Sequence, residues 1–318
     1  MVTPVIRKIF FIFLLISEAG LAQQSAIRDT SFAIQSTYEK EVKKRPYIKI
    51  ASPTPSDNVK LQLNIPYRHI GGRDLLLDIF YPDKKNKNLP AVLLIFGGGW
   101  KSGDKTQNYA MAAKLANNGY IAVSAEYRLS PEAIYPAAVY DLKSAIRWMR
   151  ANAKKYGIDS SRIAVMGTSA GGQLSALIGT TNENKLFEDT IGNGNHSSSV
   201  EAVVDIDGIL AFKHPESQEA ASASLWFGGD YEHRSDLWEQ ASALNHVDKK
   251  TVPFLFLNSS NLRFHAGRDD MIKKMNGLGI YSEWHEFPDT PHPFWFFDPW
   301  FEPMMKYSLD FLKKTFKK

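Results

Sequence analysis

The chain contains no cysteine among its 318 residues. This absence excludes disulfide bonds, thiolate metal sites, a cysteine nucleophile and a lipid-modified cysteine. The eight histidines show none of the spacings that bind zinc, so we expect no metal site either. A reactive nucleophile in this chain is therefore not a thiol.

Long apolar runs are scarce as well. The run at 9–16 follows Arg7 and Lys8 and precedes small residues at 20–22. This order predicts a secretory signal peptide over residues 1–22, because the run is too short to span a bilayer. No other segment is long and apolar enough to span one, so we predict a secreted or periplasmic protein without stable membrane insertion.

Charge of one sign is not concentrated anywhere in the chain. The net charge is +4 and the sequence pI is about 8.9, but the lysines and arginines are scattered. We therefore expect a solvated basic surface and no nucleic-acid partner. The content of 44% hydrophobic and 23% charged residues is typical of a globular protein and leaves the oligomeric state open.

Residues 59–318 are predicted to form one α/β domain, after a linker or partly helical arm at 23–58. A hairpin around Gly71 and Gly72 opens the domain. Helices separate the strands that follow, which are predicted at 91–96, 120–125, 163–166, 200–206, 252–257 and 280–287. This alternation predicts a three-layer α/β/α sandwich with a mostly parallel sheet. Two long polar insertions, 182–199 and 213–250, are candidates to cover a site.

Residues 162–172 read RIAVMGTSAGG, an order typical of a nucleophile elbow. A short apolar strand leads into a turn with small residues at Gly167 and Gly171, and a helix follows. Such a turn holds Ser169 in a strained conformation with its hydroxyl lifted out of the sheet. The alternative is an ordinary Gly-rich connection between a strand and a helix. Finding an oxyanion loop, a histidine and a carboxylate elsewhere in the chain would argue against this alternative.

Four motifs in the domain resemble one superfamily. They are GGGWKSGDK at 97–105, EYRLSPE at 126–132, YPAAVYDLKSAIRWMR at 135–150 and GIDSSRIAVMGTSAGG at 157–172. They resemble the α/β-hydrolase superfamily, in particular esterases related to hormone-sensitive lipase and bacterial carbohydrate esterases that remove acetyl or feruloyl groups from xylan and pectin. The ending PDTPHPFWFFDPWFEP at 288–303 resembles a pectin- or xylan-acetylesterase subgroup.

This resemblance implies an α/β-hydrolase fold and a serine esterase that works through an acyl-enzyme without a cofactor. Ser169 would be the nucleophile and His292, in a loop after the last strand, its base. Backbone N–H groups of Gly98, Gly99 and Ala170 would form the oxyanion hole. Phe96 departs from the superfamily pattern, because it stands where a histidine usually precedes the glycines, and this puts the positioning of the loop in doubt.

The acid of a catalytic triad has no single candidate in the sequence. Superfamily members commonly carry it after the strand at 252–257, but the loop there reads NSSNLRFHAGR. Asp207 ends the preceding strand, where Asp205 lies deeper, and Asp269 or Asp270 opens the following helix. A Ser-His dyad oriented by a neutral polar group is the third alternative.

Three residues are candidates to bind an acylated polysaccharide or oligosaccharide. Trp295, in the aromatic cluster after His292, is predicted to be an exposed stacking platform for a sugar ring, and Trp100 lies beside the oxyanion loop. Arg263 is a candidate to bind a uronate carboxylate, although helix N-terminal solvation explains it equally well. Two alternative functions stay open: a general carboxylesterase or lipase, and a catalytically inactive carbohydrate-binding relative.

Overall fold

The computed structural model describes residues 29, 31–83, 88–130, 132–218 and 220–317. The predicted signal peptide lies outside these residues. Among them, no helix combines the length and the apolar character needed to cross a membrane, and no group of histidines and carboxylates is arranged to hold a metal ion.

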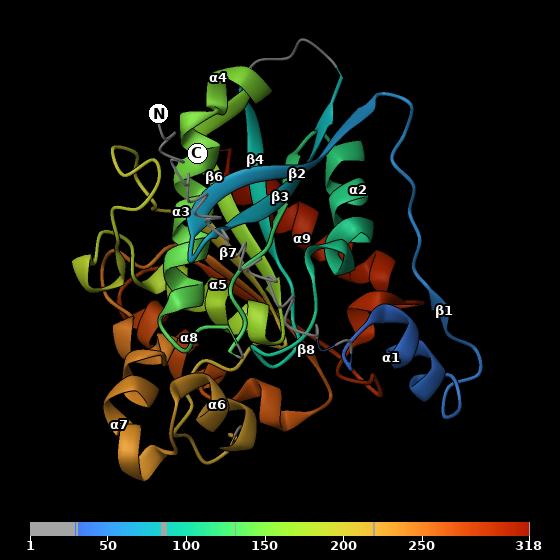
Figure 1. Cartoon of the computed structure of the whole chain (residues 1–318). Helices are drawn as coiled ribbons and strands as arrows, with labels where there is room; N and C mark the ends of the chain where they lie inside the picture. Colours follow the sequence, from blue (N-terminus) through green and yellow to red (C-terminus); the bar gives the residue numbers. More distant parts are fainter. Residues whose placement is uncertain (1–28, 30, 84–87, 131, 219, 318) are drawn as a thin grey trace, which may run out of the picture.

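An eight-stranded sheet organises the described part of the chain (Figure 1). Its strand order is β2-β3-β5-β4-β6-β7-β8-β9. The hairpin strand β3 is antiparallel to both β2 and β5, and every other pair is parallel. The strand bounds are β2 (Val59–Ile70), β3 (Arg73–Pro82), β4 (Leu89–Ile95), β5 (Ile121–Ala125), β6 (Ile158–Thr168), β7 (Ala202–Ile206), β8 (Phe254–Ser259) and β9 (Ser282–Phe287).

Helices cover both faces of this sheet, so the predicted three-layer α/β/α sandwich is confirmed (Figure 1). The first core lies between the sheet and α3 (Ala137–Ala151), α5 (Ala170–Thr180) and α8 (Arg268–Gly277). The second core lies between the sheet and α2 (Tyr109–Asn117) and α9 (Phe301–Thr315). The remaining α-helices of the described residues are α1 (Ile34–Glu41), α4 (Ala153–Tyr156), α6 (Ala220–Phe227) and α7 (Tyr231–Gln240).

Burial on both faces explains why the central strands read as continuous apolar runs. In β6, Ile163 and Val165 belong to the first core, whereas Ala164 and Met166 belong to the second. Neighbouring strand residues point to opposite faces, so both sets have to be apolar.

The segment predicted as a linker or arm lies against the C-terminal part of the domain. It contains α1 and the short strand β1 (Lys49–Ile50), which pairs with β10 (Phe297–Asp298). Tyr38 of α1 packs its ring 6.1 Å from that of Phe297. In Figure 1, α1 and β1 (blue) lie beside the C-terminal segments (red).

Candidate active site

Ser169 occupies a sharp turn between β6 and α5. Its φ of 54° and ψ of −120° are rarely adopted by residues with a side chain, so the turn stores strain that the surrounding contacts have to hold. The N–H of Ser169 donates to the carbonyl of Ile206 at the end of β7, 2.8 Å away. This bond fixes the serine at the carboxyl edge of the sheet.

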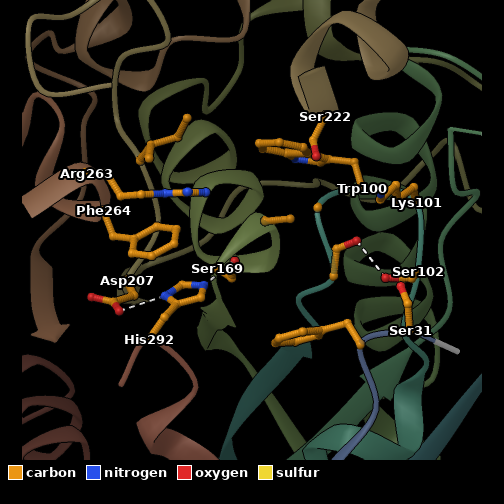
Figure 2. Close-up of a pocket in the computed structure, with 15 residues that line it drawn as sticks. Ser31, Trp100, Lys101, Ser102, Ser169, Asp207, Ser222, Arg263, Phe264 and His292 are labelled. Atoms are coloured by element: carbon orange, nitrogen blue, oxygen red, sulfur yellow. Dashed lines mark hydrogen bonds and ion pairs between the residues drawn. The ribbon is translucent and has the colours of Figure 1, made fainter. Parts of the chain in front are cut away.

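Three of the predicted catalytic residues lie in one hydrogen-bonded line (Figure 2). Nε2 of His292 is 2.8 Å from Oγ of Ser169, and Nδ1 of His292 is 2.8 Å from Oδ2 of Asp207. A carboxylate only accepts, so Nδ1 carries the proton and donates to Asp207, while Nε2 accepts from the Ser169 hydroxyl. The imidazole is thus oriented to remove the serine proton.

Asp207 reaches His292 from the end of β7. Its side chain is fully buried, and its Oδ1 accepts from the N–H of Ser259, 2.7 Å away, at the end of β8. The carboxylate therefore bridges the end of the neighbouring strand and His292. The last residue of β8 contributes a backbone N–H here in place of an acid.

The other predicted acids lie elsewhere. Asp270 is exposed on α8, and its Oδ2 is 3.3 Å from Nε2 of His214. Asp269 is exposed and accepts from Arg268, 2.8 Å away. Of the three alternatives left open by the sequence, the geometry favours Asp207 as the partner of His292.

Aromatic rings hold the imidazole of His292 on two sides. Phe264 stacks on it with a centroid distance of 3.4 Å, and Trp295 meets it edge-on at 5.0 Å. Only 1% of Trp295 is exposed, so the prediction that it forms a sugar-stacking platform is wrong. The segment after His292 is rich in aromatic residues because it is packed in the second core. Composition alone does not distinguish such a buried cluster from an exposed one.

The predicted oxyanion loop lies against the elbow because of two glycines without room for a side chain. A Cβ at Gly97 would lie 2.7 Å from the carbonyl oxygen of Thr168, and one at Gly171 would lie 2.1 Å from that of Ile95. Gly98 has a φ of 133°, and a Cβ there would meet the backbone of Ser102 at 2.2 Å. The Ser102 hydroxyl also donates to the carbonyl of Gly98, 2.9 Å away.

Phe96 has a structural place in this loop. It is buried and stacks on Tyr127 with a centroid distance of 4.4 Å. The Tyr127 hydroxyl donates to the Phe96 carbonyl, 2.9 Å away. This pair anchors the start of the loop where the superfamily pattern has a histidine.

A cavity of about 250 Å³ opens at Ser169 and His292. Its wall includes the predicted oxyanion donors Gly98, Gly99 and Ala170. The other lining residues are Ser31, Phe32, Trp100, Lys101, Ser102, Asp207, Ile209, Ser222, Arg263 and Phe264. Ser222 lies on α6, so the insertion at 213–250 does border the site.

The insertion at 182–199 does not border this cavity, contrary to our expectation. Glu188 accepts from Lys143 at 2.8 Å and Arg147 at 2.9 Å, and Asp189 accepts from Arg68 at 2.5 Å. These ion pairs hold the insertion against α3 and β2.

Trp100 and Arg263, the predicted substrate-binding residues, both border the cavity. Both side chains also contact other residues of the protein. Trp100 is 2% exposed, stacks on Trp226 at 4.8 Å and donates from Nε1 to Gln173. Arg263 is half-buried, with its guanidinium 4.6 Å from the centre of the Phe264 ring. Phe264 was missed at the sequence level, although its position after β8 places it at the same sheet edge as the elbow.

Residues 77–272 match the protein family described as BD-FAE, which is more than half of the chain. The chain belongs to the BD-FAE family. The match includes Ser169 and Asp207, whereas His292 and the N-terminal arm lie outside it. BD-FAE membership and the α/β-hydrolase fold agree with the resemblance of the four motifs.

Solved structures and curated proteins resemble this BD-FAE chain over different lengths. A truncated carbohydrate esterase from gut microbiota is 28% identical with a TM-score of 0.70, covering 83% of this chain and all of that one. A bifunctional GH43-CE protein of Bacteroides eggerthii is 26% identical with a TM-score of 0.67, covering 80% of this chain and 38% of that one. Esterase LipC of Mycobacterium tuberculosis is 33% identical over 192 residues, which are 58% of this chain and 47% of that protein. The chain thus spans about half the length of the curated relatives it matches.

Proposed function

We propose that the chain is an exported serine esterase that removes a small acyl group, acetyl before feruloyl, from a plant cell-wall polysaccharide such as pectin or xylan. The single observation that carries the esterase chemistry is the hydrogen-bonded line from Ser169 through His292 to Asp207, ending in a cavity. The predicted signal peptide supports export, and the carbohydrate esterase among the similar structures supports the substrate class.

The mechanism follows from the positions of these groups. His292 Nε2 takes the Ser169 proton as Oγ attacks the ester carbonyl, and Asp207 stabilises the imidazolium that forms. The N–H groups of Gly98, Gly99 and Ala170 face the developing oxyanion, where one donor contributes about 2.7–4 kcal/mol in the transition state. His292 then protonates the leaving alcohol and activates the water that hydrolyses the acyl-enzyme.

A general carboxylesterase is the second candidate. It is supported by the similarity to esterase LipC, whose name gives an esterase and mentions no polysaccharide substrate. The cavity of about 250 Å³ has room for a short acyl group in either case, so the two candidates are separated by the acyl chain that each prefers.

Acetate release from acetylated xylan and acetylated pectin, measured side by side with p-nitrophenyl acetate and hexanoate, separates the candidates. We expect acetate release from at least one polysaccharide and a preference for the acetate ester. Ser169→Ala should lose at least about 10³-fold in kcat, along with labelling by a fluorophosphonate probe. Full activity of Ser169→Ala would refute the chemistry, and a preference for hexanoate with inert polysaccharides would favour the general esterase.

A further inference from the structure

The N-terminal arm reaches the cavity that contains Ser169. Ser31 and Phe32 line this cavity, although they lie far outside the residues that match the BD-FAE family. Phe32 is half-buried and precedes α1 directly. The wall that it forms is therefore a feature of this chain that the family match does not cover.

Phe32 contacts the segments that follow the oxyanion loop and His292. On one side, its carbonyl accepts a hydrogen bond from Nε2 of Gln107, a buried residue in the short helix after the oxyanion loop. On the other side, its ring lies 6.4 Å from Trp295 and 5.9 Å from Phe296. Trp295 in turn meets the His292 ring, so Phe32 lies between the short helix after the oxyanion loop and the aromatic segment after His292.

The arm is fixed in this position by contacts further along. Lys49 and Ile50 pair with Asp298 and Phe297, and the N–H of Ala51 donates to the carbonyl of Phe296, 2.8 Å away. Phe32 is thus a bulky side chain on an anchored backbone, which is what a wall of defined position requires.

We infer that Phe32 is a specificity-determining residue that limits the size of the group accepted beside Ser169. This inference rests on the proposed esterase function. A ring at the wall of a small cavity excludes a longer chain by steric overlap, and a smaller side chain at the same position opens that space. Phe32 acts on which ester enters and takes no part in proton transfer.

The test is the ratio of kcat/KM for p-nitrophenyl hexanoate to that for the acetate. We expect Phe32→Ala to raise this ratio about tenfold or more, Phe32→Leu to raise it less, and Phe32→Trp to lower it. A ratio measured on one enzyme cancels any loss of active protein. A parallel series of acetate esters with larger alcohols shows which side of the ester Phe32 borders.

Tyr38→Ala is the matched control. It removes a second aromatic contact between the arm and the segment after His292, but Tyr38 does not line the cavity. We expect it to lower the melting temperature and leave the ratio unchanged. Equal ratios for wild type and the Phe32 variants in both series, or equal shifts in Phe32→Ala and Tyr38→Ala, would overturn the inference alone. A wild-type protein that hydrolyses no ester would overturn the proposed function and this inference together.

Discussion

Asp207 lies where two strand ends meet, and this explains how an acid from β7 can orient His292. The register pairs Ile206 with Leu257, so Asp207 emerges from β7 beside the last residues of β8. Asp207 has a φ of 52°, and its N–H donates to the Leu257 carbonyl at 2.9 Å. The carboxylate is thereby turned toward β8, where Ser259 donates to one oxygen and His292 to the other.

Replacing this carboxylate tests the choice among the predicted acids. We expect Asp207→Asn to fold and to lose about 10⁴-fold in kcat, because an amide that faces Nδ1 favours the wrong tautomer of His292. Steady-state kinetics with p-nitrophenyl acetate measure the loss, and circular dichroism checks the fold.

Asp270→Asn is the matched control for this change. Its carboxylate faces His214 on the exposed surface, so we expect kcat within a factor of two of wild type. A large loss in Asp270→Asn, or near-normal turnover in Asp207→Asn, would contradict the assignment and favour the dyad or the second acid.

The sequence is most informative about elements whose causes are local. The elbow combines an apolar strand, small residues and a helix within a few positions, and the structure has that order from β6 to α5. Asp207 was one of three alternatives, because facing His292 depends on which strand ends lie side by side. The exposure of Trp295 was predicted wrongly, because the sequence around a tryptophan is similar whether its side chain is buried or exposed. The position of Phe32 at the cavity could not be predicted, because its aromatic partners lie far away in the sequence.

The close approach of β4 to α5 gives a prediction at the scale of elements. We expect Gly171→Ala to lower stability by about 1–3 kcal/mol and to reduce kcat/KM, because the added methyl group would lie 2.1 Å from a β4 carbonyl oxygen and push the oxyanion loop away from the elbow. Thermal unfolding and hydrolysis of p-nitrophenyl acetate measure the two effects. Gly277→Ala, at the end of α8, is the control, because no atom of the described part of the chain lies within 4 Å of its added methyl group. A Gly171→Ala protein as stable and active as Gly277→Ala would contradict this prediction, because stability and activity would then not depend on the close contact between the oxyanion loop and the elbow.

At the scale of the whole molecule, buried charges lie at the junctions between layers. Lys105, after the oxyanion loop, donates to the fully buried Asp78 of β3 at 2.7 Å. Arg128 donates to the fully buried Asp141 of α3 at 2.8 Å. Each pair ties a loop at the carboxyl edge to an element of the sandwich. Asp141 also pairs with Arg68, 3.1 Å away, whereas losing Lys105 would leave the charge of Asp78 buried without its ion-pair partner.

Asp205 differs from these residues because it is buried and forms no ion pair with a cation of the described residues. Its Oδ1 accepts from the N–H of Gly208 at 2.9 Å, and its Oδ2 has no hydrogen-bond partner among the described residues. Burial raises the pKa of Asp205 well above its usual value, with a smaller contribution from the charge of Asp207. The folded protein therefore holds a proton on Asp205 at pH values where the unfolded chain has released it.

This difference makes the stability of the whole molecule depend on pH. A carboxyl group whose pKa is raised by folding contributes stability below its unfolded pKa, near 4, and loses that contribution as pH rises through the folded value. Each unit of difference corresponds to about 1.36 kcal/mol. Asn mimics the neutral acid and keeps the Gly208 hydrogen bond. We therefore expect Asp205→Asn to match wild-type stability near pH 4 and to exceed it increasingly at higher pH, as measured by urea unfolding from pH 4 to 8.

Asp159 provides a control of opposite sign. Although burial acts to raise its pKa, hydrogen bonds from Ser161 and Arg162 lower the pKa below its usual value. Its contribution is present above the unfolded pKa and is lost as pH falls, so Asp159→Asn should be less stable than wild type at pH 7 and approach it in acid. A loss of stability in Asp205→Asn that grows as pH rises would mean that Asp205 is ionised in the folded protein and that its charge holds the turn before Gly208. Opposite slopes of the two variants would instead assign the pH dependence to the proton that folding holds on Asp205.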